Sequence, residues 1–254
     1  MYSHRLGLRG PDRIDRRDFI LTFSRQLVLP EKVSLRDRCP DVFNQLNLGS
    51  CVANATCGVM QFNDKQDDNI YSPLSRRMLH RECLEYDGNP NEDLGTYVRT
   101  AIRCAAVKGV CLEKLWPYNV SEFDYKPNAD CYADALNRRI YAYHRILSMF
   151  DIRACLTSGK PFILGIPIFT SFESDHVART GEVPMPKKGE LLLGYHAVYC
   201  CGYNDKTRRV ECANSWGYNW GDRGFFTLPY AFIEKYVLPE GRGDCWTITR
   251  QLIS

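Results

Sequence analysis

The spacing of apolar residues along the chain changes near its middle. From about residue 50 to residue 137, apolar positions recur every three or four residues, which is typical of amphipathic helices. From about residue 162 onward, short apolar runs between turn residues predict strands. A helical half followed by an antiparallel half predicts an α+β fold, with a cleft at the junction of the halves.

Three helices are predicted in the first half. Residues 51–62 form one of them, with Ser50 as its N-cap, because apolar side chains recur along one face. A second helix is predicted to open at Ser72-Pro73, with apolar residues on one face and arginines on the other. A third is predicted from residue 96 to residue 108, stopping at Gly109.

The second half is predicted to hold one short helix and then a series of strands. The helix spans about residues 151–158, and Gly159 and Pro161 end it. The predicted strands that follow span residues 162–166, 195–203, 209–214, 224–228 and 246–249.

These patterns divide the chain into an N-terminal arm (1–28), a mainly helical half (29–137) and a mainly β half (138–254). The arm holds six arginines, partly offset by three aspartates. We expect it to be an exposed segment of mixed charge. A contact with nucleic acid or another acidic surface, and a short inhibitory lid folded over the cleft, are the alternatives.

One cysteine, one histidine and one asparagine stand in the order that a thiol-dependent acyl-transfer enzyme needs. Cys51 opens a predicted helix, whose positive end favours a thiolate, and His196 lies on a predicted strand of the other half. Asn214 can accept from one ring nitrogen of His196 and leave the other for the sulfur. Taken singly, Cys51 is better interpreted as an inert buried thiol and His196 as a buried, hydrogen-bonded histidine. Gln45, Gly49 and Ser50 around the thiol, and the NSW run that starts at Asn214, reverse that preference.

Gln45 lies six residues before Cys51 and supplies a candidate hydrogen-bond donor. Its side-chain amide and the backbone N–H of Cys51 would together stabilise a tetrahedral oxyanion. In the resulting reaction Cys51 attacks a carbonyl, His196 protonates the departing amine, and water hydrolyses the thioester. The cysteine would carry the bond-forming step and the histidine both proton transfers.

The residues around these four groups resemble the papain-like cysteine peptidases (peptidase family C1) over about residues 15 to 250. The resemblance rests on Gln45, on Gly49-Ser50-Cys51, on Tyr195-His196-Ala197-Val198 and on the run NSWGYNWGDRGFF that starts at Asn214. A closer resemblance, to the bacterial-like intracellular branch of that family, is carried by LPEKVSLR from Leu29, GTYVR from Gly95, LWPY from Leu115, SFES from Ser171 and GEVPMP from Gly181.

This resemblance implies a papain-like two-domain fold, with a helical left domain, an antiparallel β-barrel-like right domain and the active-site cleft between them. It also implies a peptide or protein substrate, endopeptidase activity by default, and no metal or organic cofactor. Trp216 is expected to shield the bond between Asn214 and His196, and Trp220 to shape the leaving-group side. The substrate-binding positions are expected at Gly49, Ser50, Gly95, Gly194, Tyr195, Trp216 and Trp220.

Three residues depart from the pattern of the family without removing a chemical group. Leu46 replaces a glycine that usually follows the glutamine, and Val52 replaces an aromatic residue often found after the nucleophile. Leu48 stands where secreted members have a disulfide cysteine. Geometry of the binding subsites is therefore not transferable by resemblance.

The chain has twelve cysteines, and eleven remain if Cys51 stays a free thiol. Because eleven is odd, complete disulfide formation would still leave at least one more cysteine unpaired. No secretory signal and no apolar run long enough to span a bilayer is evident. We therefore expect buried free thiols, an intracellular reducing compartment and no membrane partner, with an oxidised virion as the alternative location. No pair of cysteines has zinc-site spacing.

Two other functions compete with a peptidase. A catalytically silent papain-like scaffold would use the fold for binding or structure, but such a protein would not need both the thiol and the histidine. A transpeptidase or isopeptide-directed enzyme would pass the thioester to an amine other than water. A monomer without a nucleic-acid partner is expected in each case.

Overall fold

The computed structural model describes residues 5–67, 72–239 and 244–249. Strands and helices occur in the order expected of an α+β protein, with most helices early and most strands late. The strands are β1 (Lys32–Ser34), β2 (Ala142–Arg145), β3 (Phe162–Phe169), β4 (Leu192–Asn204), β5 (Arg209–Ala213), β6 (Phe225–Pro229) and β7 (Cys245–Thr249). The helices are α1 (Cys51–Asp67), α2 (Arg76–Tyr86), α3 (Val98–Val107), α4 (Ala129–Ala135), α5 (Met149–Thr157), α6 (Asp175–Thr180) and α7 (Tyr230–Tyr236), with short 3₁₀ turns η1 (Arg36–Arg38), η2 (Val120–Glu122) and η3 (Thr170–Glu173).

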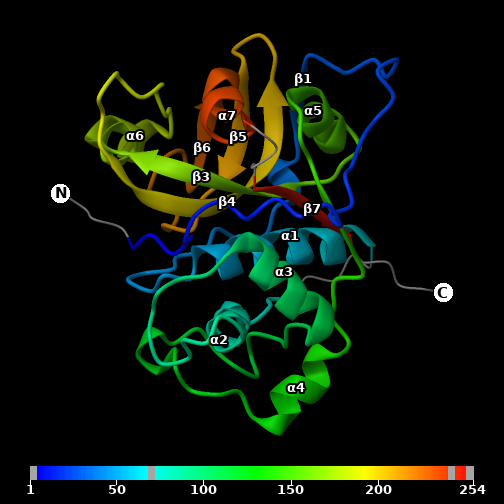
Figure 1. The fold of residues 1–254 in the computed structure, drawn as a ribbon, viewed down its shortest axis with the longest axis vertical. Coiled ribbons are helices and arrows are strands. Elements are labelled where there is room, and N and C mark those ends of the chain that lie inside the picture. Colours follow the sequence, from blue (N-terminus) through cyan, green and yellow to red (C-terminus); the bar gives the residue numbers. More distant parts are fainter. Residues whose placement is uncertain (1–4, 68–71, 240–243, 250–254) are drawn as a thin grey trace.

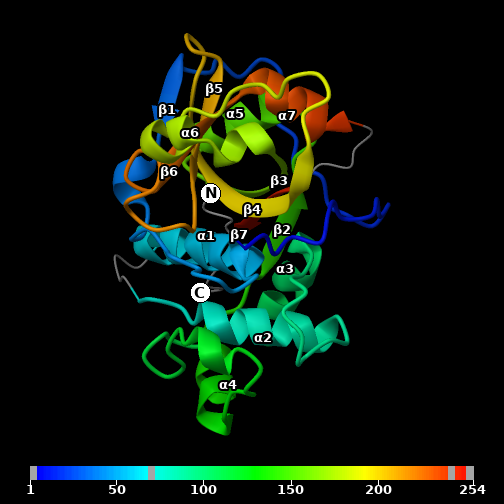
Figure 2. The same ribbon diagram turned by 90° about the vertical axis from the view of Figure 1, so that its left-hand side faces the viewer.

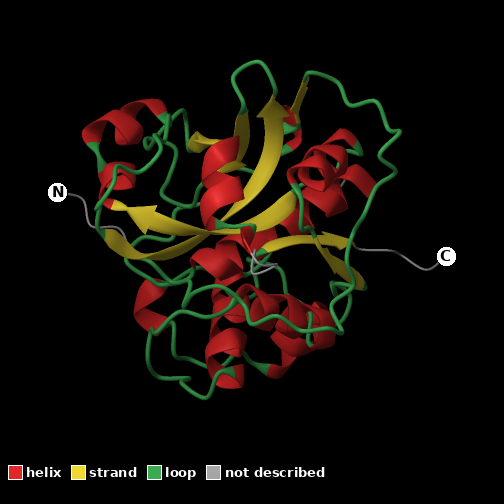
Figure 3. Cartoon of the chain, turned by 45° about the horizontal axis from the view of Figure 1, so that its top comes forward, coloured by secondary structure: helices red, strands yellow, loops and turns green. Residues whose placement is uncertain are grey.

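The strands form one antiparallel sheet in the order β2-β7-β3-β4-β5-β6, and β1 pairs with β4. Figure 1 shows the sheet above and helices α2, α3 and α4 below, with α1 between them. Figure 3 shows the same division, with the strands in the upper and middle part of the view and a group of helices below them. The predicted papain-like α+β fold is therefore confirmed.

Helix α1 is the central element, and it is buried on all sides rather than on one face. Every side chain from Cys51 to Phe62 is buried. Its polar residues are satisfied locally, since Thr56 Oγ1 donates to the carbonyl of Val52 at 2.8 Å. A side chain at Gly58 would come within 2.6 Å of the Tyr199 ring, so α1 packs closely against β4.

Helix α2 differs from its prediction in two ways. It begins after Ser75, whose hydroxyl accepts from the N–H of Met78, and not at Ser72-Pro73. The expected solvent face of arginines is wrong, because Arg77 and Arg81 are only 3% and 6% exposed. The guanidinium of Arg77 lies 4.2 Å from the Trp116 ring centre, so the loop before α4 covers this face.

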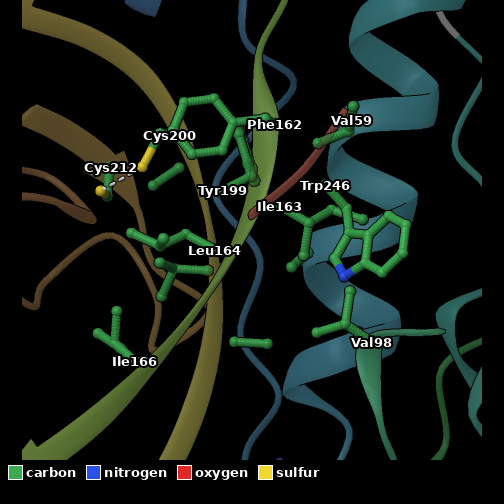
Figure 4. Packing of buried hydrophobic residues seen from close by; sticks show 14 of the residues in the cluster. Val59, Val98, Phe162, Ile163, Leu164, Ile166, Tyr199, Cys200, Cys212 and Trp246 are labelled. Carbon is green, nitrogen blue, oxygen red and sulfur yellow. Dashed lines mark hydrogen bonds between the residues drawn. The ribbon is translucent and has the colours of Figure 1, made fainter. Parts of the chain in front are cut away.

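The core of the sheet lies on β3, whose seven residues from Phe162 to Ile168 are all buried. Figure 4 shows Ile163 of β3 beside Trp246 of β7, with Val59 and Val98 of the helical half on the same side and Leu164 on the opposite side of β3. One continuous hydrophobic cluster therefore joins the two halves.

All twelve cysteines are free thiols, and all except Cys39 are buried. Cys200 and Cys212 face each other across β4 and β5 with their sulfurs 3.0 Å apart (Figure 4). Among the described residues no helix is long and apolar enough to cross a membrane.

Candidate active site

The cysteine and the histidine lie on the two elements that meet at the centre of the molecule. Cys51 is the first residue of α1, and His196 lies on β4 opposite Ile166 of β3. The backbone N–H of Ala197, next to His196, lies close enough to the Cys51 sulfur to lower the pKa of the thiol. The strand that carries the histidine therefore touches the sulfur at the helix tip.

His196 is oriented by Asn214, which follows β5 directly. The Nε2 atom of His196 lies 2.8 Å from the Oδ1 atom of Asn214. Oδ1 also accepts from the backbone N–H of Ser215 at 2.8 Å, which identifies it as the amide oxygen. Nε2 must then carry the proton and donate it, which leaves Nδ1 as the basic nitrogen of this tautomer.

Trp216 covers the histidine. Its ring centre lies 4.8 Å from that of His196, and Trp220 and Phe172 pack against Trp216 in turn. Both tryptophans are 6% exposed. The hydrogen bond between His196 and Asn214 lies beside these rings, where the low local dielectric makes it stronger than it would be in water.

Gln45 is buried and its amide is fixed from both ends. Oε1 accepts from the Ser215 hydroxyl at 2.6 Å, so Nε2 is the end that points toward Leu48 and the arm. Nε2 donates to the carbonyls of Leu48 and Arg5, each at 2.9 Å. The donor predicted for an oxyanion therefore already holds a peptide carbonyl.

Leu46, where the family usually has glycine, adopts a φ of +54°. That left-handed conformation is unfavourable for a residue with a branched side chain, by about 1 kcal/mol. Its N–H donates to the Asn44 side chain at 2.9 Å, which helps to hold this turn. The substitution noted in the sequence thus leaves the backbone in the conformation that a glycine would favour.

The N-terminal arm runs between the two halves and over the sulfur. Leu8 forms a parallel bridge with Thr96 on the helical side and an antiparallel bridge with Tyr195 on the β side. The N–H of Thr96 donates to the Gly7 carbonyl at 2.9 Å, and the N–H of Arg9 donates to the Thr96 carbonyl at 3.1 Å. Figures 1 and 2 show this dark blue segment passing between the sheet and helices α1 and α3.

Three glycines make this close approach possible. A side-chain carbon at Gly95 would lie 2.1 Å from the Gly7 carbonyl oxygen, and one at Gly7 would lie 1.8 Å from that of Gly49. One at Gly194 would lie 2.9 Å from the Leu6 side chain. Gly95 and Gly194, predicted as approach points for a peptide, both border a peptide in the structure, and that peptide is the arm.

A cluster of buried charges anchors the arm farther along. The N–H of Asp12 donates to the Asp244 carboxylate at 3.0 Å, and Asp12 accepts from the N–H of Arg99 at 3.0 Å. Arg99 holds Asp18 through both its terminal nitrogens, and Arg145 lies 3.4 Å from Asp18. We call these five residues the latch.

The arm is thus buried where it crosses the centre, and the expectation of an exposed arm does not hold there. Gly7, Leu8, Gly10 and Asp12 are all buried. Farther on, Ile14, Phe19 and Val28 are exposed. The sequence carried no signal for this path, because its partners lie 40 to 232 residues away along the chain.

The Cys51 sulfur is sealed from solvent under the arm. Its exposed fraction is 0%. Burial raises the pKa of the Cys51 thiol to about 11, although hydrogen bonds from the N–H groups of Ala197 and Gly7 lower it. At neutral pH this closed form therefore holds a thiol rather than a thiolate.

The remaining predicted positions are placed around this centre. Gly49 and Ser50 directly precede Cys51. The Ser50 hydroxyl forms a 2.5 Å hydrogen bond with the Tyr118 hydroxyl, so the Ser50 side chain points toward the helical half. Two further residues near the site were not predicted from the sequence. Asp93 accepts from the N–H of Gly49, and the Nε2 atom of His80 lies 3.2 Å from a carboxylate oxygen of Asp93. A single aspartate in a loop has no motif that could have identified it.

The described residues contain no group of three or more histidine, cysteine, aspartate or glutamate side chains that could hold a metal ion. The side chains described at this centre are one thiol, one imidazole and two amides.

Comparison with known proteins agrees with this geometry. Residues 29–235 match the model of the papain family of cysteine proteases. An uncharacterised peptidase C1-like protein of Acanthamoeba polyphaga mimivirus is 31% identical, with 92% of this chain and 83% of the relative covered. Chymopapain of Carica papaya is 24% identical, covering 86% of this chain and 60% of its own length.

Among solved structures, xylellain, a cysteine protease from Xylella fastidiosa, is similar over 99% of both chains, with 31% identity and a TM-score of 0.88. Procathepsin B from Trypanosoma congolense has a TM-score of 0.74 at 18% identity, covering 97% of this chain and 87% of that one, and so shows the fold alone. By its sequence, its fold and the residues at its centre, this chain belongs to the papain family of cysteine proteases and is a cysteine-type peptidase.

Proposed function

We propose that this protein hydrolyses peptide bonds within protein chains through a thioester on Cys51. His196 acts first as the partner that holds the thiolate and then as the acid for the departing amine, and Asn214 orients it. Gln45 and the backbone N–H of Cys51 stabilise the oxyanion. The observation that carries the proposal is the hydrogen bond of Asn214 to His196 beside a strand that touches the Cys51 sulfur.

The binding of an extended peptide is supported by the arm. A stretch of main chain already lies on Thr96 and Tyr195, one from each half, and places a carbonyl on Gln45. Main-chain pairing of this kind depends little on side chains, so a substrate in an extended conformation would use the same groups.

We also propose that the arm is an inhibitory lid. Residues 5 to 12 occupy the groups that a substrate needs and exclude water from the sulfur, so the described form is a closed one. Opening the arm restores water around Cys51, removes the main cause of its raised pKa and allows the ion pair with His196. Peptidase activity therefore requires the arm to move.

Two variants of the same helix test the peptidase proposal. Cys51→Ala should abolish cleavage of a peptide library, while Cys57→Ala, which removes another fully buried thiol of α1, should keep it. A peptidyl epoxide should label the wild type and Cys57→Ala, and mass spectrometry should locate the label on Cys51. Cleavage that survives in Cys51→Ala, or a complete lack of cleavage after the arm is displaced, would contradict the proposal.

A further inference from the structure

Between Gln45 and Cys51 lies a peptide unit that controls the direction of the Gln45 amide. The Leu48 carbonyl accepts from Gln45 Nε2 at 2.9 Å and from the N–H of Ser50 at 2.8 Å. The N–H of Gly49 belongs to the same peptide unit and points the opposite way, since a trans peptide is planar. Whatever holds that N–H also sets where the carbonyl faces.

The group that holds it is Asp93. Its two carboxylate oxygens lie 2.8 and 3.1 Å from the Gly49 nitrogen. A side-chain carbon at Gly49 would come within 2.7 Å of the carboxylate, so the fit allows only glycine. No disulfide fixes this segment, because all twelve cysteines are free.

Asp93 is itself built into the helical half. His80 of α2 is wholly buried, and its Nε2 atom lies 3.2 Å from a carboxylate oxygen of Asp93. Burial alone would raise the pKa of Asp93, but the hydrogen bonds from His80 and Gly49 and the charge of Arg5 outweigh it and hold the pKa below its ordinary value. The group is therefore a carboxylate at neutral pH, and a strong acceptor.

We propose that Asp93 is a positioning residue of the active site, which fixes the Leu48–Gly49 peptide and through it the oxyanion-stabilising amide of Gln45. This inference rests on the proposed function. The arm uses the same carboxylate in the closed form, because Arg5 Nε lies 3.3 Å from it and the Arg5 guanidinium also donates to the Asp93 carbonyl at 2.6 Å. Arg5 is half exposed, so its contact is the weaker one.

A direct electrostatic role would have the opposite sign. The charge of Asp93 raises the pKa of Cys51, although burial contributes more. If Asp93 acted only through that charge, removing it would favour the thiolate and speed the reaction. A positioning role predicts that removing it slows acyl transfer.

The test uses the full chain carrying Arg5→Ala, which removes the contact of the arm with Asp93 from every variant. In that background Asp93→Ala should lower kcat per active site by about 10- to 100-fold, as expected for a misplaced oxyanion donor, with little change in KM. Asp93→Asn should lose less, because its amide oxygen can still accept from Gly49. Glu92→Gln, a change at the exposed neighbouring residue, is the matched control and should behave like the parent.

A second readout separates positioning from unfolding. Alkylation of Cys51 by iodoacetamide displaces iodide and needs no oxyanion hole, so its rate in Asp93→Ala should stay within about threefold of the parent. If hydrolysis per titrated site is unchanged in Asp93→Ala, or if alkylation falls in parallel with hydrolysis, the inference is overturned while the peptidase assignment stands. If the Arg5→Ala parent shows no Cys51-dependent hydrolysis, even in the presence of Asp18→Ala, the proposed function fails and the inference with it.

Discussion

The two ends of the N-terminal arm are held by different kinds of interaction. Over the sulfur, residues 5 to 9 pair mainly through their backbone and fit only because Gly7, Gly95 and Gly194 lack side chains. At the latch, Asp18 is held by the guanidinium groups of Arg99 and Arg145. Asp12 accepts from the backbone N–H of Arg99, and its own N–H donates to the buried Asp244 carboxylate. We expect the first end to determine whether a peptide can lie between the two halves, and the latch to determine whether that peptide is the arm.

This difference matters because backbone pairing is available to any extended chain, including a substrate. The latch has no counterpart in a general substrate, since it needs two carboxylates at a fixed separation from the segment over the sulfur. We therefore expect the latch to supply most of the preference for the arm over other peptides. The following changes separate the two ends.

The largest effect is expected from Asp18→Ala. Removing one partner of a buried ion pair typically costs 3–5 kcal/mol, because the remaining charge is left buried, and Arg99 and Arg145 both lose a partner here. Because Arg145 also lies near Asp244, which remains in the variant, we expect a free-energy cost at the lower end of that range. The arm should then open more often, and the rate of Cys51 alkylation should rise about 100-fold. Asp15→Ala, whose carboxylate pairs with the exposed Arg17, is the control and should leave the rate near that of the wild type.

Gly7→Ala should open the cleft end alone. The added carbon would sit 1.8 Å from the Gly49 carbonyl oxygen, so the segment over the sulfur must shift, at a cost of about 1–3 kcal/mol. Alkylation of Cys51 should rise about tenfold while residues 12 to 18 stay protected from amide hydrogen exchange. If residues 5 to 9 and residues 12 to 18 lose their protection from exchange together, the arm moves as one unit and its two ends are not held independently.

Asp12→Asn should tighten the latch at neutral pH. Burial raises the pKa of Asp12. Burial, together with the nearby charge of Asp12, also raises the pKa of Asp244. Closure is therefore most stable below the ordinary pKa of an aspartate and weakens as the pH rises through the raised values. The charged groups that face this pair from the surrounding elements are Arg99, Arg145 and Asp18.

An amide in place of the Asp12 carboxylate keeps an acceptor for Arg99 and removes the repulsion from Asp244. The alkylation rate of Asp12→Asn relative to wild type should be near one at pH 4 and fall about threefold by pH 7, one pKa unit being worth about 1.4 kcal/mol. A ratio that does not change with pH would show that the pair does not control closure.

The smallest effect is expected from Arg5→Ala. Its guanidinium is half exposed, and exposed ion pairs contribute about 0–1 kcal/mol. Alkylation of Cys51 should rise by less than about twofold, as measured by mass spectrometry of the labelled peptide. A rise comparable with that of Asp18→Ala would place the main restraint at the cleft end.

Much of the fold could be predicted from local patterns. The strands β3 to β7 and the helices α1, α3 and α5 lie close to their predicted positions, because each has a long periodic or apolar run. The strands β1 and β2 and the short helices α4, α6 and α7 were not predicted. β1 has three residues and exists because it pairs with residues 202–204, a contact that no local pattern contains.

The residues proposed to carry the chemistry could be predicted from sequence motifs. The residues that hold them or the arm in place could not. Gln45, Cys51, His196 and Asn214 carry their signal in neighbouring residues, and the structure brings them to one centre. Asp93 and the latch depend on pairs far apart in sequence, such as Asp12 with Asp244. The division of the chain into residues 1–28, 29–137 and 138–254 remains a prediction.

The most direct test is the pH dependence of the reaction of Cys51 with dipyridyl disulfide, in wild type, Asp18→Ala and Asp18→Ala with His196→Ala. Closure favours the thiol, so the wild-type rate should be low at neutral pH and rise steeply toward the raised pKa of about 11. Asp18→Ala should show a second, reactive range below pH 7 from the thiolate–imidazolium pair, and His196→Ala should abolish it. The same alkaline titration in all three proteins would contradict the account.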